Sequence, residues 1–288
     1  MPPRFRIIAH RGASAHAPEN TLAAFERAIA LGAEEIELDV RLSSDGEILV
    51  FHDDRLDAKT KLEGRVRHYD ARVLERTDLL PWFLARERSD VERRLEGVLD
   101  ADAADDPDRE TCIPRLDTVL ARFGGRVRYH IEIKGWDDLL PLGVLRSVDA
   151  HGLRERVTLT SFSQRPLVEI RKLDPKLPIT FLLRDAADAL RSSEFRPELE
   201  GRTLRDVHAY WIEQAAKSGF QWVGIRARDL SPEAVESARA LGLAIRCWGV
   251  RTEEDLRRAV ALGAIGATVD WPGHALALGQ GARAGASV

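Results

Sequence analysis

The chain has 288 residues, among which only two are cysteines and six are lysines, and it contains no apolar stretch of 18 residues. Cys112 and Cys247 lie far apart and outside any C-x-x-C spacing, so neither a disulfide framework nor a thiolate metal site is expected. The formal net charge of -4 gives no basic face, so we expect no nucleic-acid partner. Because no stretch is long enough to cross a bilayer, we expect no transmembrane segment and a cytoplasmic location.

A hydrophobic content of 44% is sufficient for one large core. Short β-branched runs alternate with amphipathic helical stretches, which is typical of parallel βα units. Eight strands are expected, over residues 5–9, 35–40, 129–134, 157–160, 179–183, 222–225, 244–248 and 267–269. We therefore predict an α/β protein with a (β/α)8 TIM barrel in one domain over residues 1–278, and a flexible tail over residues 279–288.

Residues 54–111 interrupt this alternation. An additional strand is expected over residues 48–51, after a hairpin turn with Asp45-Gly46 at its tip. Beyond it the chain becomes charged and helix-prone, with an acidic loop over residues 101–108. We interpret residues 54–111 as a helical and loop insertion at the barrel mouth. A solvated surface arm is the alternative, because runs of charged residues usually face water.

The first fifth of the chain carries groups suited to phosphate ester chemistry. Glu37 and Asp39 lie two residues apart in an expected strand, so they share a face and can reach one hard cation. His10 and His52 each end a strand, and a pair of histidines can divide the work of general acid and general base. Arg11 can fork onto phosphate oxygens. Taken singly, each of these groups also fits an ion pair or a structural hydrogen bond.

Four motifs in this region resemble the glycerophosphodiester phosphodiesterase family in order and spacing: HRG at residues 10–12, PENT at 18–21, E-x-D at 37–39 and HD at 52–53. Later segments are similar to that family as well, namely E-x-K at residues 132–134, SF at 161–162, and two segments that contain Trp248 and Trp271. The resemblance covers nearly the whole chain and is weakest over residues 54–111 and 184–210.

This resemblance implies metal-dependent hydrolysis of small-molecule glycerophosphodiesters to sn-glycerol 3-phosphate and an alcohol. It implies that one divalent cation, Mg²⁺ or Ca²⁺ with Mn²⁺ as a further candidate, is bound by three carboxylates. The expected site consists of metal ligands Glu37, Asp39 and Glu132, catalytic His10 and His52, phosphate-binding Arg11 and Lys134, and pocket residues Glu19, Trp248 and Trp271. Which histidine is the acid stays open, as do simple core packing of the tryptophans and the oligomeric state.

Other functions are compatible with parts of this pattern. A lysophospholipase D-like phosphodiesterase would need an apolar groove, to which residues 82–84 could contribute. A barrel glycosidase could use two of the carboxylates but would leave His10, His52 and Lys134 without a role. A phosphate-binding module without activity would not need the histidine pair.

Overall fold

The computed structural model describes residues 5–95, 97–98, 110–135, 137–193 and 196–284. The chain divides into two compact units: unit A contains residues 7–157 and 270–288, and unit B contains residues 1–6 and 158–269. The expected acidic loop at residues 101–108 and the end of the expected tail lie outside the described residues.

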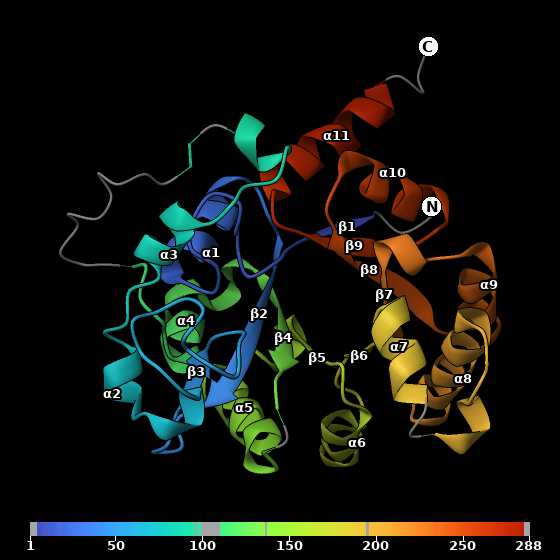
Figure 1. The fold of residues 1–288 in the computed structure, drawn as a ribbon, viewed down its shortest axis with the longest axis horizontal. Coiled ribbons are helices and arrows are strands. Elements are labelled where there is room, and N and C mark those ends of the chain that lie inside the picture. The colour runs from blue at the N-terminus through green and yellow to red at the C-terminus, as the bar shows by residue number, and fades with distance from the viewer. Residues whose placement is uncertain (1–4, 96, 99–109, 136, 194–195, 285–288) are drawn as a thin grey trace. The chain divides into compact units, whose positions relative to one another are not determined.

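Unit A contains three parallel strands, to which β3 adds an antiparallel hairpin partner. In Figure 1, β2 and β4 lie side by side, with α4 and α5 near them. The bounds in this unit are β1 (Arg6–Ala9), α1 (Leu22–Ala30), β2 (Glu35–Leu42), β3 (Ile48–Val50), η1 (Val66–His68), α2 (Ala71–Leu74), α3 (Leu80–Ala85), η2 (Glu92–Arg94), α4 (Leu116–Phe123), η4 (Gly124–Arg126), β4 (Arg128–Ile133), α5 (Leu139–Ala150), η5 (Arg154–Arg156) and α11 (Pro272–Ala284).

Helix α1 sits directly behind the segment that carries the first motif. Thr21 is its N-cap and accepts a hydrogen bond from the Ala24 backbone N–H. Phe25 packs its ring edge against Phe123 and is fully buried, which anchors the helix to α4. Gly12 has a φ of +83°, and a Cβ there would lie 2.6 Å from the Ala24 carbonyl carbon. Only glycine allows this close approach of loop to helix.

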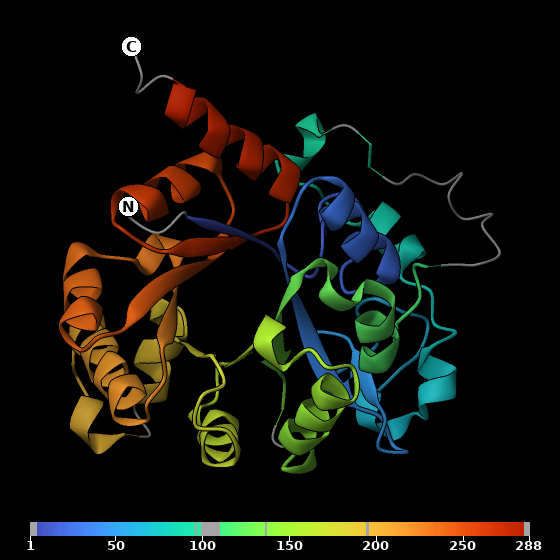
Figure 2. The ribbon, with the colours of Figure 1, turned by 180° about the vertical axis from the view of Figure 1, so that it is seen from behind.

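Unit B contains parallel strands in the order β5-β6-β7-β8-β9. Figure 2 shows α8 and α9 next to each other alongside β7 and β8. The bounds in this unit are β5 (Val157–Ser161), α6 (Gln164–Leu173), β6 (Ile179–Leu182), α7 (Ala186–Ser193), η6 (Pro197–Leu199), α8 (Leu204–Lys217), β7 (Trp222–Arg226), η7 (Ala227–Asp229), α9 (Pro232–Ala240), β8 (Ala244–Val250), α10 (Glu253–Ala261) and β9 (Gly266–Val269).

Eight parallel strands alternate with helices along the chain, and each begins and ends within two residues of its predicted range. Their strand interiors are rich in buried Ile, Val and Leu, as expected for parallel strands that are covered on both faces. The predicted (β/α)8 barrel fold is therefore confirmed, as is the additional strand β3 with its Asp45-Gly46 turn.

The described part of the insertion at residues 54–111 has a small buried core beneath its exposed residues. Leu56 and Leu74 from the insertion are fully buried against Leu49 and Phe51 around β3. A small second core therefore fixes the loop that follows β3. This loop carries a residue that reaches the site described below.

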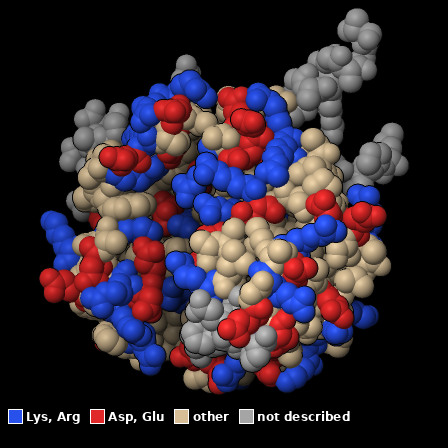
Figure 3. Space-filling model, turned by 45° about the vertical axis from the view of Figure 1, so that its right-hand side comes forward, with Lys and Arg blue, Asp and Glu red and all other residues tan. Residues whose placement is uncertain are grey.

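Charges of both signs are spread over the face of the molecule that Figure 3 shows. In Figure 3, Lys and Arg side chains are interspersed with Asp and Glu over the described residues of the face shown. Among the helices that the structure describes, none has the length and apolar character needed to cross a membrane.

Candidate active site

Three buried carboxylates lie on the neighbouring strands β2 and β4. Glu37 and Asp39 alternate with Leu38 along β2, and Asp39 is directly opposite Glu132 of β4 in the parallel register. Carboxylate oxygens of Glu37, Asp39 and Glu132 all lie within 4.8 Å of one another. The structure thus brings together the three predicted metal ligands, which the sequence places almost 100 residues apart.

Crowding of these charges perturbs their ionisation. Burial and the adjacent Asp39 carboxylate raise the pKa of Glu37 to about 7, although His10 and Arg11 oppose the shift. Burial also opposes ionisation of Asp39, but the cations of Lys134 and Arg11 prevail and hold the pKa of this carboxyl well below its usual range. Negative charge on Glu37 is therefore unfavourable within the cluster of three carboxylates.

The backbone of the HRG motif turns sharply at this cluster. Arg11 has a φ of +54° and Gly12 a φ of +83°, so two consecutive residues are left-handed. This turn lets the Arg11 backbone N–H donate to Glu37 Oε2 at 3.0 Å. The Arg11 side chain lies 2.8 Å from Glu19 Oε1 through Nη1 and 3.1 Å from Asp39 Oδ2 through Nε. The left-handed backbone at Arg11 therefore places an N–H group where it orients Glu37, a proposed metal ligand.

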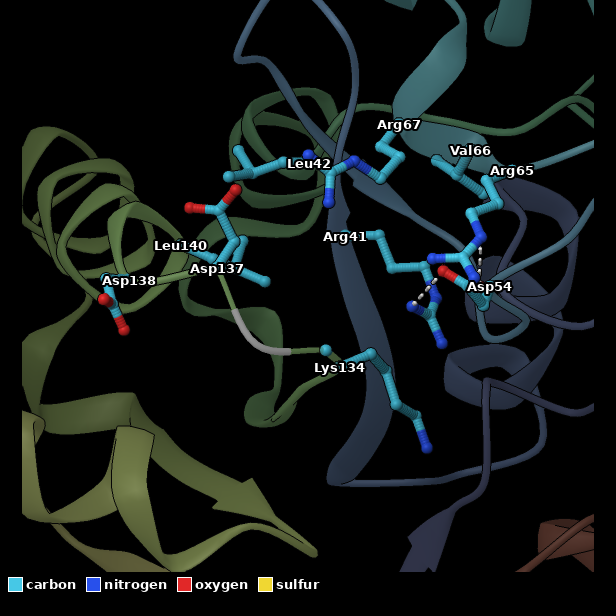
Figure 4. Close-up of a pocket in the computed structure, with 11 residues that line it drawn as sticks. Arg41, Leu42, Asp54, Arg65, Val66, Arg67, Lys134, Asp137, Asp138 and Leu140 are labelled. Atoms are coloured by element: carbon cyan, nitrogen blue, oxygen red, sulfur yellow. Dashed lines mark ion pairs between the residues drawn. The ribbon is translucent and has the colours of Figure 1, made fainter.

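Lys134 follows β4 on the same face as Glu132. Its Nζ lies 3.2 Å from Asp39 Oδ1 and also pairs with Glu132. Burial would lower the pKa of this ammonium, but the carboxylates of Asp39 and Glu132 raise it above its ordinary value. Lys134 is therefore a fixed positive charge next to the carboxylate cluster. Figure 4 shows the same side chain among the residues that line a neighbouring cavity.

His10 is held by an aspartate from the far end of the chain. Its Nδ1 lies 2.6 Å from Asp270 Oδ1, which also accepts from Ser14 Oγ at 2.9 Å. Burial and Arg11 lower the pKa of His10, but Asp270 more than offsets them, so the pKa is raised above 6.5. Because Nδ1 is occupied, Nε2 is the ring nitrogen left for proton transfer.

His52 has a parallel arrangement. Its Nδ1 lies 2.6 Å from Oδ1 of Asp53, the next residue, and its backbone carbonyl accepts from Arg41 Nε at 2.8 Å. Asp53 also pairs with Lys59 of the insertion at 2.7 Å. Both histidines thus belong to His–Asp pairs, a geometry that fixes the tautomer and stabilises an imidazolium.

Several residues of this network were missed from the sequence. Asn20 has a φ of +59°; its amide nitrogen donates to Asp39 Oδ2 at 2.8 Å and its amide oxygen accepts from the Asp39 backbone N–H at 3.2 Å. Asn20 therefore holds Asp39, and the N-cap of α1 is the next residue, Thr21. Asp53, Lys59 and Asp270 were also not assigned. Asp53 and Asp270 stand in motifs whose pattern marks them, but nothing local to Lys59 does.

Each of the three expected pocket residues has its own surroundings in the structure. Glu19 is buried between Arg11 and Lys59, both of which lower its pKa against the opposing effect of burial. Trp271 is 1% exposed and packs edge to face with His274, as a core residue does. Trp248 belongs to unit B, where its indole N–H donates to the Leu183 carbonyl. A substrate-binding role for these residues stays a prediction.

The donor set fits a hard divalent cation. Among the described residues, the network contains six carboxylates, from Glu19, Glu37, Asp39, Asp53, Glu132 and Asp270, against three Lys and Arg side chains that pair with them, from Arg11, Lys59 and Lys134. Asp39 Oδ1 is buried and accepts no well-oriented hydrogen bond from the described residues. Oxygen ligands of this kind bind Mg²⁺ or Ca²⁺, and an added cation would relieve the repulsion at Glu37.

Comparisons with known proteins identify the family of the chain. The model of the glycerophosphoryl diester phosphodiesterase family matches residues 10–274. The glycerophosphodiester phosphodiesterase of Bacillus subtilis (strain 168) is 27% identical over 94% of this chain and 85% of its own length. A solved structure from Silicibacter pomeroyi DSS-3 has a TM-score of 0.79 at 25% identity and covers 98% of this chain and 95% of its own. An Oleispira antarctica phosphodiesterase, solved with the product sn-glycerol-3-phosphate, has a TM-score of 0.73 at 20% identity, with 94% and 95% coverage.

Proposed function

Because the chain belongs to the glycerophosphoryl diester phosphodiesterase family, we propose that it uses one divalent cation to hydrolyse glycerophosphodiesters to sn-glycerol 3-phosphate and an alcohol. One observation carries the proposal: a triad of carboxylates within 4.8 Å lies in the same network as two His–Asp pairs. A barrel glycosidase would not require this combination. A lysophospholipase D-like phosphodiesterase would use the same groups and differs in the pocket for the alcohol.

The cation would be held by Glu37, Asp39 and Glu132. When bound, it would neutralise charge on the phosphate and on the attacking oxygen. The protein's own groups would then bind and orient the diester. Arg11 and Lys134 supply fixed positive charge toward the phosphate, and both are pre-positioned by carboxylates of the cluster.

Hydrolysis breaks the bond between phosphorus and the alcohol oxygen while an oxygen from water becomes bonded to phosphorus. One proton must leave the water and another must reach the departing alkoxide. We assign the second transfer to His10, because Asp270 raises its pKa and so favours the protonated, proton-donating form. His52, held at Nδ1 by Asp53, would accept the proton from water through Nε2.

The alcohol would occupy a cavity of about 720 Å³ beside Lys134 (Figure 4). Seven of its eleven lining residues are charged, including Arg41, Arg65 and Arg67. Asp54 is paired with both Arg41 and Arg65, at 3.6 and 3.3 Å. A lining of this composition favours a polar head group over an acyl chain. Phe83, one of the residues expected to form an apolar groove, is fully buried instead.

A test of the activity begins with removal of metal by EDTA and dialysis, followed by assay on glycerophosphocholine with enzymatic detection of sn-glycerol 3-phosphate. We expect activity to be lost and then restored by Mg²⁺, Ca²⁺ or Mn²⁺. Full activity in excess EDTA would exclude the metal assignment. Release of choline phosphate instead of sn-glycerol 3-phosphate would show that the other ester bond is cut.

A second test concerns the cavity. Arg67→Gln should change the ratio of kcat/KM between glycerophosphoserine and glycerophosphocholine by roughly 3- to 10-fold, the worth of about one ordinary hydrogen bond, because Arg67 is exposed to solvent. Arg55→Gln is the matched control, because Arg55 is exposed, pairs with Asp57 and does not line the cavity. Equal ratios in all three proteins would place the alcohol elsewhere.

A further inference from the structure

Lys59 belongs to the insertion and pairs with two carboxylates of the proposed active site. It lies in the loop after β3, where its backbone N–H and that of Thr60 both donate to the Leu56 carbonyl. Leu56 is fully buried in the small core of the insertion. The backbone of Lys59 is therefore held by a hydrogen bond to a residue of this core, and that contact sets where the Lys59 side chain begins.

The ammonium of Lys59 is enclosed on several sides. Nζ lies 2.7 Å from Glu19 Oε1 and 2.7 Å from Asp53 Oδ2, and the side chain is 11% exposed. The same nitrogen lies 5.0 Å from the ring centroid of Trp82 on α3 and 5.7 Å from that of Phe51. Two carboxylates and two aromatic faces thus hold one compact positive charge.

Each carboxylate bound by Lys59 has a second partner in the site. Asp53 uses its other oxygen, Oδ1, to hold His52 Nδ1 at 2.6 Å. Glu19 uses Oε1 to accept from Arg11 Nη1 at 2.8 Å. Lys59 is therefore linked through one carboxylate to His52, a proposed proton-transfer group. Through the other it is linked to Arg11, a proposed phosphate-binding group.

We propose that Lys59 is a positioning residue that orients His52 through Asp53 and Arg11 through Glu19. The inference deepens the proposed function, on which it rests, and makes the insertion a structural part of the active site. Without the ammonium, Asp53 and Glu19 would be two like charges facing an emptied space, and each carboxylate would gain freedom to rotate. Asp53 would then hold His52 less firmly, and Glu19 would hold Arg11 less firmly.

Because Lys59 acts on His52 through Asp53 and on Arg11 through Glu19, its loss should change both kcat and KM. Loss of His52 orientation should lower kcat, because proton transfer is part of the chemical step. Loss of Arg11 orientation should raise KM as well, since phosphate binding precedes that step. For residues that orient active groups, the usual loss is roughly 10- to 100-fold in activity.

The kinetic test uses the full chain with saturating metal and glycerophosphocholine. Lys59→Met should lower kcat and raise KM, while Lys59→Arg should recover part of kcat because it restores the charge. In an Asp53→Asn background, Lys59→Met should have little further effect on kcat. In a Glu19→Gln background, it should have little further effect on KM. Lys61→Met is the matched control, since Lys61 is exposed in the same loop and should leave both constants unchanged.

Additive losses in both double mutants, or wild-type constants for Lys59→Met, would overturn the inference. A second measurement does not depend on activity: in ¹⁵N-histidine spectra of the metal-free protein, Lys59→Met should move the His52 Nδ1 signal and Lys61→Met should not. An unmoved signal would also overturn it. If the wild-type chain hydrolysed no glycerophosphodiester while the signal moved as expected, the proposed function would fail and the positioning role of Lys59 would stand.

Discussion

Glu37→Gln is the most informative single substitution, because it should stabilise the metal-free protein while removing its response to metal. Glutamine keeps the shape of the side chain, and its oxygen can still accept from the Arg11 backbone N–H. What it removes is one of three negative charges within 4.8 Å. Burial and the repulsion from Asp39 raise the pKa of Glu37 to about 7, so the charge that glutamine removes is an unfavourable one.

The magnitude follows from linkage between ionisation and folding. An acid whose folded pKa lies above its unfolded value of 4.5 leaves stability intact below pH 4.5, and stability is lost as the pH rises through the folded pKa. A difference of about 2.5 pKa units corresponds to about 3 kcal/mol at pH 8 and to less than about 1 kcal/mol at pH 5. For a chain of this size, about 3 kcal/mol raises the melting temperature by roughly 6 to 12 °C.

Calorimetric melting in EDTA at pH 5 and pH 8 measures this effect. We expect Glu37→Gln to melt above the wild-type protein at pH 8, with most of the difference gone at pH 5. Saturating Mg²⁺ at 100 times its Kd should then stabilise the wild-type protein by about 2.7 kcal/mol and the variant by much less.

The matched control is Glu35→Gln, two residues earlier on the same face of β2. Glu35 pairs with buried His130 at 2.7 Å, so this variant should lose stability and keep its response to Mg²⁺. If Glu37→Gln melted at or below the wild-type temperature in EDTA at pH 8, the three carboxylates would not repel one another as the structure implies.

Three further predictions concern the proton-transfer groups, the metal ligands and the backbone turn. His10→Ala and His52→Ala should each lower kcat by roughly 10²- to 10⁴-fold, and only His10→Ala should recover on a p-nitrophenyl ester, whose good leaving group needs little protonation; rescue of His52→Ala instead would reverse the assignment. Asn20→Ala should weaken metal activation by roughly 10- to 100-fold in a Mg²⁺ titration, because Asp39 loses its amide partner, and an unchanged titration would contradict that role. Gly12→Ala should melt well below the wild-type protein in calorimetry, since a Cβ would lie 2.6 Å from the Ala24 backbone, whereas Gly46→Ala meets no atom within 4 Å and should cost less.

The sequence by itself determined the order of elements and the identity of the chemistry. Alternation of apolar runs with helical stretches depends on local periods of two and 3.6 residues, so all eight strands were predicted to within two residues. Glu37 and Asp39 are two residues apart, and that spacing alone places both on one face of β2. Groups that act within one strand or one turn are therefore visible from the sequence.

Only the tertiary structure decided which distant residues complete the site. His10 pairs with Asp270, 260 residues away, and Lys59 reaches Glu19 across 40 residues because the insertion packs on its own small core. Asn20 has a residue type that helix caps and left-handed turns share, and only its position beside Asp39 shows that it holds this carboxylate. Partners of this kind are selected by packing and by the neutralisation of buried charge, which depend on spatial neighbours and leave no local period in the sequence.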